Sequence, residues 1–194
     1  MPGDLYITGD AAADRLLNTS FDALIIGMLL DQQVPLEWAF RGPHTLEQRL
    51  GHLDIGVIAG LDQEAFVAVC CEQPAIHRFP ASMGRRVHSL SGVLATDWSG
   101  SAENLWADGC DASTLTKRLQ ALPGFGPEKT RIFIALLAKR FGVRPDGWER
   151  AAGVFSDDEP RSIADCADEQ SLAAVREWKA AQKAAGKDKQ GRRL

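Results

Sequence analysis

The 194-residue sequence has few of the residues that build metal centres or cross-linked folds. Its four cysteines have spacings that match neither a zinc finger nor a redox pair: Cys70, Cys71, Cys110 and Cys166. The four histidines lack metal-ligand spacing with these cysteines. The sequence also has no dinucleotide fingerprint, no phosphate-binding P-loop and no GxSxG motif. These absences argue against redox, nucleotide-dependent and serine-hydrolase chemistry, and we expect the cysteines to be buried thiols.

The sequence also lacks a long apolar run and an excess of positive charge. No stretch of about 18 apolar residues occurs, and no basic, apolar leader is found, so we expect a cytoplasmic protein without a membrane partner. The formal net charge of −4 argues against a surface that is basic all round. Residues 129–150 nevertheless carry six basic and two acidic side chains, a local charge of +4. This segment is either a solvated helix face or a surface for phosphates.

Apolar residues at helical spacing predict an all-α fold, and the hydrophobic content of 45% is enough for a real core. Candidate N-caps precede several of the helices: Asp10, Asp62, Asp111 or Ser113, and Asp168 or Ser171. A capping box at Thr45-Leu46-Glu47-Gln48 predicts a separate short helix to Leu50. The expected helices cover residues 11–17, 21–30, 45–50, 63–71, 82–95, 102–107, 112–121, 127–141, 148–154 and about 168–185. The basic end, residues 186–194, reads as a frayed tail.

A tight Pro-Gly-x-Gly turn joins two of the predicted helices. Gly124 and Gly126 permit positive φ and a close approach of the backbone, and Pro127 suits the first turn of the second helix. The amides of Gly124, Gly126 and Lys129 would then face outward at a helix N-terminus, where a phosphate oxygen can bind. The pattern predicts a helix-hairpin-helix that holds a nucleic-acid backbone, with an αα-hairpin that only packs as the alternative.

Two further features accompany the hairpin. The apolar helix over residues 21–30 ends in Asp31-Gln32-Gln33-Val34-Pro35, and Pro35 forces Val34 out of the helical conformation. Gln33 therefore lies in an exposed corner, which could also be an ordinary polar turn. Asp146 follows Gly126 by 20 residues in Arg144-Pro145-Asp146-Gly147-Trp148. An aspartate at this point is either a catalytic carboxylate or the N-cap of the next helix.

The hairpin, its spacing to Asp146 and the Leu-x-x-Gln form of the corner resemble the helix-hairpin-helix, Gly/Pro-rich loop, aspartate superfamily of base-excision DNA glycosylases, over about residues 21–152. The resemblance implies two helical lobes with a central cleft. Residues 21–138 would form a six-helix, barrel-like lobe that ends in the hairpin. Residues 1–20 and 139–194 would form the second lobe. It also implies a monomer, associated with the nucleoid, that binds double-stranded DNA containing a damaged or mismatched base.

The resemblance assigns roles to individual residues. Asp146 would stabilise the oxocarbenium-like sugar and position a water molecule, and Gln33 would fill the space left by the extruded base. Trp38 and Trp148 are candidate walls for the base pocket, with the protein core as the alternative place for both. The residues expected to contact DNA besides Gln33 are Gly124, Phe125, Gly126, Lys129 and Arg131.

Glu128 occupies the position, 18 residues before Asp146, where bifunctional family members carry a Schiff-base lysine. The resemblance therefore implies a monofunctional glycosylase without AP-lyase activity. Only Cys166 follows Asp146, so we expect no iron–sulfur cluster and no other cofactor. A monovalent ion on the carbonyls of Gln120, Leu122 and Phe125 is compatible with the resemblance.

The substrate and two other functions stay open at this point. The first apolar helix lacks the carboxylate of the adenine-excising branch, which leaves uracil-like or mismatched pyrimidines and alkylated purines. A non-catalytic helix-hairpin-helix module would bind DNA without releasing a base. A helical adaptor for protein partners would not bind DNA at all.

Overall fold

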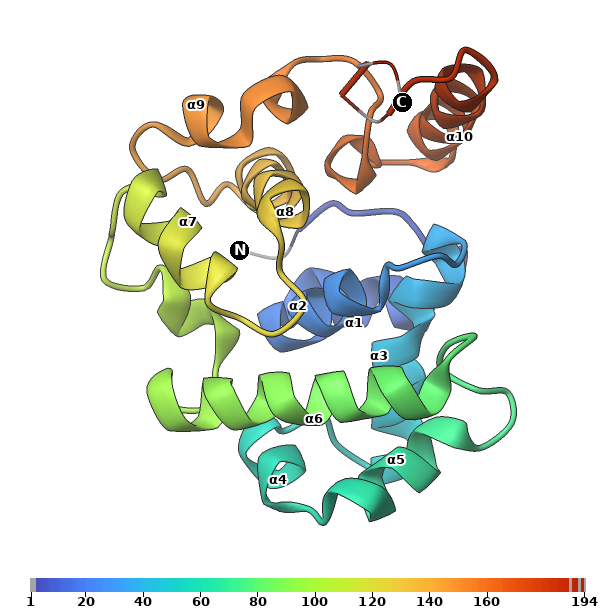
Figure 1. The fold of residues 1–194 in the computed structure, drawn as a ribbon, viewed down its shortest axis with the longest axis vertical. Coiled ribbons are helices and arrows are strands. Elements are labelled where there is room, and N and C mark those ends of the chain that lie inside the picture. Colours follow the sequence, from blue (N-terminus) through green and yellow to red (C-terminus); the bar gives the residue numbers. More distant parts are fainter. Residues whose placement is uncertain (1–2, 189, 192, 194) are drawn as a thin grey trace.

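The computed structural model describes residues 3–188, 190, 191 and 193, and its regular elements are helices (Figure 1). Among these residues the only pairing of extended backbone is an isolated bridge between Lys187 and Arg193. The predicted all-α class is therefore confirmed. The α-helices are α1 (Ala11–Thr19), α2 (Phe21–Leu30), α3 (Leu36–Leu50), α4 (Ile55–Gly60), α5 (Gln63–Cys71), α6 (Pro80–Asp97), α7 (Ala112–Gln120), α8 (Pro127–Arg140), α9 (Trp148–Ala152) and α10 (Glu169–Ala184). Three short 3-10 helices are η1 (Ala102–Leu105), η2 (Gly153–Ser156) and η3 (Ile163–Asp165).

Side-chain caps begin many of these helices, as the sequence predicts. The carboxylate of Asp10 accepts hydrogen bonds from the amides of Ala12 and Ala13 at the start of α1. Those amides lower the pKa of Asp10 because they stabilise its charged form. Asp62, Asp111 and Asp168 cap α5, α7 and α10 in the same way. Each cap satisfies backbone donors that have no partner inside the helix.

The predicted helix start at Thr45 is wrong, because α3 continues through Pro43 to Leu50. The Thr45 hydroxyl donates to the carbonyl of Arg41 and caps nothing. A proline inside a helix costs about 3 kcal/mol. Packing of α3 against α2 offsets this cost. The buried side chains of α3 include Leu36, Phe40 and Leu46.

Helix α2 is the centre of the core. All of its residues from Ala23 to Leu30 are buried, and one apolar cluster surrounds it that extends from Leu5 to Val175. In Figure 1, α1 and α2 lie between α6 on one side and α8 on the other. The cluster contains residues of both expected lobes, and the division at residues 21–138 stays a prediction. Among the described helices, none is both long and apolar enough to cross a membrane.

Helices α7 and α8 form the predicted hairpin, and Gly124 is the residue that requires glycine. Its φ is +80°, and a Cβ atom there would lie 2.4 Å from Cδ1 of the buried Leu29 in α2. Gly126 is the N-cap of α8 with φ −78°, so of the two hairpin glycines only Gly124 uses a positive φ. Nothing lies within 4 Å of the place where its Cβ would be. Pro127 begins α8, as predicted.

We predict that Gly124→Ala destabilises the protein by about 1–3 kcal/mol, because the left-handed backbone and the contact with Leu29 both oppose a side chain. Gly126→Ala is the matched control, since its backbone is extended and its surroundings are open. Urea unfolding of both variants measures the difference. Equal midpoints for the two alanine variants would contradict the packing described here.

Candidate nucleic-acid interface

The ammonium of Lys129 connects the hairpin to the end of α2. Its Nζ donates to the carbonyls of Leu29 and Asp31, each at 3.2 Å, and also to the carbonyl of Met28. These carbonyls belong to the negative end of the α2 dipole and have no partner inside that helix. The side chain of Lys129 is therefore part of the fold, and only its backbone amide remains for the predicted contact with DNA.

The corner after α2 holds Gln33 in a conformation that is unusual for its residue type. Its φ is +58°, and its side chain is exposed. A left-handed backbone costs a non-glycine residue roughly 1–2 kcal/mol, and such residues concentrate at functional sites. The predicted corner is confirmed in geometry, while the role of Gln33 in DNA stays a prediction.

Gln32, the residue before Gln33, is held in place by hydrogen bonds of its side chain and its backbone. Its amide nitrogen Nε2 donates to the Leu29 carbonyl at 2.9 Å, and its Oε1 accepts from Arg86 at 2.7 Å. Its backbone carbonyl accepts from Nε2 of His77 at 2.9 Å. Residues of α2, of α6 and of the segment before α6 thus all bind Gln32, and the backbone next to Gln33 is therefore held firmly.

His77 is a buried histidine whose two ring nitrogens are both engaged. While Nε2 donates to Gln32, Nδ1 accepts the amide proton of Phe79 at 3.0 Å. The ring is 1% exposed, and burial lowers its pKa below the ordinary value of 6.5. The hydrogen bonds require one proton on the ring, so His77 is neutral in the folded protein near pH 7.

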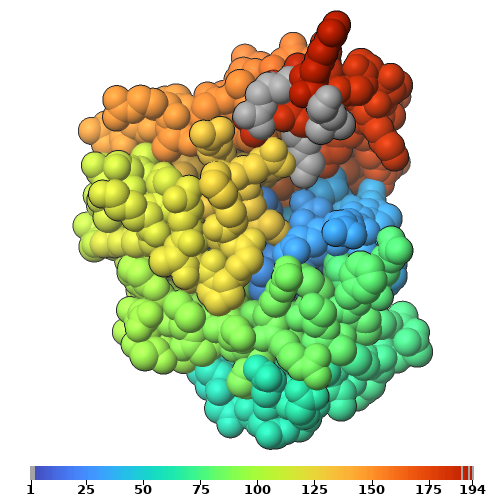
Figure 2. All heavy atoms as spheres, in the orientation of Figure 1, coloured from blue at the N-terminus to red at the C-terminus, as the bar shows by residue number. Residues whose placement is uncertain are grey.

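A cavity of about 280 Å³ separates the end of α2 from the start of α8. Asp31, which follows α2, and Gly126 and Glu128 at the start of α8 are among the residues that line it. A second cavity, of about 550 Å³, is lined by Asp31, by Gln33 and by residues of α3 and α10. Figure 2 shows this face, with the blue corner between the yellow hairpin, the red α10 and the green α6. Asp31 is the residue that both cavities share.

Asp146 lies in the loop between α8 and α9. It is exposed, and its carbonyl accepts the amide proton of Ala112 at 3.0 Å, at the start of α7. The residues that line the two cavities beside Glu128 do not include Asp146. Gly147, not Asp146, is the N-cap of α9. The expectation that Asp146 lines the cleft stays a prediction.

The other predicted site residues are divided between the core and the surface. The ring of Phe125 is 3% exposed and packs edge-on against Phe133, so the ring belongs to the core, and a DNA contact through the backbone of this residue stays a prediction. Trp148 is partly buried against the core. Arg131 is exposed and donates to Oε1 of Gln190 at 3.5 Å. At the expected ion site, the carbonyl of Leu122 accepts the amide proton of Phe125 at 3.2 Å and thereby closes the turn.

An aromatic row lies near Gln33, and it contains Trp38, which the sequence marked as a candidate pocket wall, and Phe79, which the sequence did not mark. Trp38 and Phe79 are 39% and 46% exposed, and the ring of His77 lies between them, at 6.4 and 6.0 Å from their centroids. The guanidinium of Arg78 lies 5.0 Å from the ring of Phe79. Exposed rings next to cations are typical of surfaces that stack on nucleic-acid bases. The signal in the sequence was the motif His-Arg-Phe-Pro at residues 77–80, where the phenylalanine has a basic neighbour.

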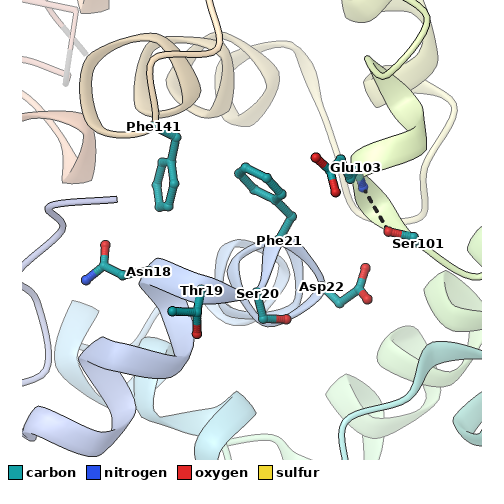
Figure 3. A pocket seen from close by; sticks show the side chains of 8 residues that line it. All are labelled: Asn18, Thr19, Ser20, Phe21, Asp22, Ser101, Glu103 and Phe141. Carbon is teal, nitrogen blue, oxygen red and sulfur yellow. Dashed lines mark hydrogen bonds between the residues drawn. The ribbon is translucent and has the colours of Figure 1, made fainter. Parts of the chain in front are cut away.

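Another hollow, of about 540 Å³, lies at the other end of α2 (Figure 3). Phe21 and Phe141 face it from one side, and Asp22 and Glu103 lie toward the other. Asp22 accepts the amide proton of Ala102 at 2.7 Å, and burial raises its pKa. No lysine or arginine lines this hollow, so it does not suit a phosphate.

The described residues contain no group of three or more histidine, cysteine, aspartate or glutamate side chains that could hold a metal ion. Cys70 and Cys166 are buried thiols, as predicted, and burial raises the pKa of each to about 12. Cys71 and Cys110 are only partly buried.

Comparison with known protein families found none that matches this chain, and comparison with curated proteins found no match either.

We predict that His77 makes the protein less stable in mild acid. As the pH falls through 6.5 the unfolded chain takes up a proton that the buried ring does not, so stability present above pH 6.5 is lost. The loss has a limiting slope of about 1.4 kcal/mol per pH unit and ends below the lowered pKa of the folded state. Urea unfolding across this window should show a smaller loss in His77→Gln. The control His44→Gln should keep the wild-type loss, and a wild-type slope in His77→Gln would refute the assignment.

Proposed function

We propose that this protein binds duplex DNA with the hairpin face and excises a damaged or mismatched base by hydrolysing its N-glycosidic bond. The observation that carries the proposal is the start of α8, where exposed Gly126 leaves open space at the positive end of a 14-residue helix. Backbone amides at such a point bind a phosphate oxygen without reading sequence. The nearby Arg131 and Arg86 add positive charge.

The corner at Gln33 supports the extrusion of a base. Removing a base from the stack costs a few kcal/mol, and a polar side chain that fills the gap offsets part of this cost. Gln33 is exposed on a strained turn that Gln32 holds in place, so little further ordering is required when it enters a duplex. The exposed rings of Trp38 and Phe79 offer stacking surfaces beside it.

The cleft carboxylates supply the chemistry that this reaction needs. Loss of the base gives the sugar oxocarbenium character, which a fixed negative charge stabilises. Asp31 lines one cavity together with Gly126, at the proposed phosphate site, and another cavity together with Gln33, which would enter the duplex. In this proposal Asp31 stabilises the sugar, and Glu128 holds the water molecule whose oxygen bonds to C1′ as the base departs. The sequence-based alternative assigns the carboxylate to Asp146.

A non-catalytic module that uses the same hairpin is the second candidate. It is favoured by the cavities at the hairpin, because neither cavity that Glu128 lines includes Asp146. It predicts binding to DNA without release of a base from any substrate. The two candidates share the hairpin and differ only in the cleft.

Duplexes that each carry one lesion, uracil, a mismatched pyrimidine or an alkylated purine, separate these candidates. We expect the wild type to leave alkali-labile abasic sites in at least one duplex, and Asp31→Asn to abolish them while affinity changes only a few fold. Asp146→Asn is the matched control and should keep full activity. Loss of excision in Asp146→Asn alone would return the catalytic role to Asp146. Binding without any excision would support the module.

We also predict that borohydride traps no covalent adduct between the wild type and an abasic duplex. Glu128 cannot form an imine, and the ammonium of Lys129 is held by the α2 carbonyls. Strand incision should therefore require added alkali. An adduct that disappears in Lys129→Met, with the fold of that variant verified by circular dichroism, would instead identify a lyase.

A further inference from the structure

The C-terminal tail turns back onto the first turn of α8, as its described residues 187, 188, 190, 191 and 193 show. Gly186 ends α10 with φ +65°, which reverses the chain, and Gly191 has φ +78°. The amide of Lys187 donates to the Gln182 carbonyl at 2.9 Å, and the bridge between Lys187 and Arg193 closes the loop. The expectation of a frayed tail is wrong for these described residues, because they form a closed turn.

Gln190 lies at the tip of this turn and contacts two charged residues in the first turns of α8, Glu128 and Arg131. Its Nε2 donates to Oε2 of Glu128 at 3.2 Å, and its Oε1 accepts from Nη1 of Arg131 at 3.5 Å. The backbone amide of Gln190 donates to the Asp188 carboxylate at 2.8 Å, which holds the backbone of the turn in place. In Figure 2 the red tail lies against the yellow hairpin helix.

The region beneath the tail is loosely packed. A cavity of about 300 Å³ lies between Glu128, α10 and the tail residues Lys187 and Asp188. Oε1 of Gln182, which lines this cavity, is buried and has no hydrogen-bond partner among the described residues. A buried acceptor without a partner loses the hydrogen bonds that water would give it, which favours opening of the contact.

We propose that the tail is an intramolecular competitor of DNA that covers the first turn of α8 and releases it when a duplex binds. This inference rests on the proposed function, because it takes the start of α8 as the phosphate site. In the closed state Gln190 engages Glu128 and Arg131. In the open state both residues are accessible from the cleft. Lys187 and Arg193 of the tail can then contact the phosphate backbone.

Hydrogen exchange followed by mass spectrometry tests the contact without DNA. In Gln190→Ala the tail amides should exchange faster than in the wild type, because residue 190 no longer binds Glu128 and Arg131. Gln170→Ala, an exposed glutamine in the first turn of α10, is the matched control and should leave exchange in the tail unchanged. Unchanged exchange in Gln190→Ala would overturn the proposal.

Fluorescence anisotropy with a labelled duplex that carries one tetrahydrofuran abasic analogue tests the competition. Gln190→Ala removes the contact without changing net charge, and we expect it to bind roughly 3–10-fold more tightly than the wild type. Equal affinities would overturn the tail as a competitor and leave DNA binding intact, and weaker binding would identify the tail as a simple DNA-binding arm. If the wild type, Gln190→Ala and a chain ending at Gly186 all fail to bind, the proposed function fails, and the competition fails with it.

Discussion

The contact between Lys129 and the end of α2 is the interaction on which the rest of this face depends. One ammonium binds carbonyls that lie about 100 residues earlier in the chain, and it joins the negative end of α2 to the first turn of α8. Gly124 lies against Leu29 at the same junction, where any side chain would prevent the approach. The ammonium of Lys129 and the close approach of Gly124 therefore join the hairpin to the end of α2, next to the corner at Gln33.

The distribution of charge explains how an acidic protein can present a surface suited to phosphates. The hairpin face combines the positive end of α8 with Arg131 and Arg86, whereas the hollow at the other end of α2 is lined by Asp22 and Glu103 and by no basic side chain. A duplex would be attracted to one side of the molecule and repelled from the other. The net charge of −4 is thus compatible with local binding of DNA.

The corner and the aromatic row illustrate how rigidity and exposure are combined. Gln33 and Phe79 are exposed, but each adjoins a residue that is held from several directions, Gln32 in the first case and His77 in the second. His77 links the two because it donates to the carbonyl of Gln32 and accepts the amide proton of Phe79. A buried neutral histidine therefore supports both exposed side chains of the proposed DNA surface.

The sequence by itself determined the helical class, the N-caps at Asp10, Asp62, Asp111 and Asp168, and the glycine turn of the hairpin. These features follow from local chemistry, since a cap or a turn involves residues only a few positions apart. The break expected at Thr45 failed because long-range packing of α3 on α2 outweighs the local signals of Pro43 and the capping box.

Only the tertiary structure decided which side chains share the cleft. Spacing in the sequence pairs Glu128 with Asp146, whereas the cavity between α2 and α8 is lined by Glu128 together with Asp31. The ammonium of Lys129 is held by carbonyls at the end of α2. No local pattern encodes either arrangement, because each depends on how two helices distant in the sequence pack against each other.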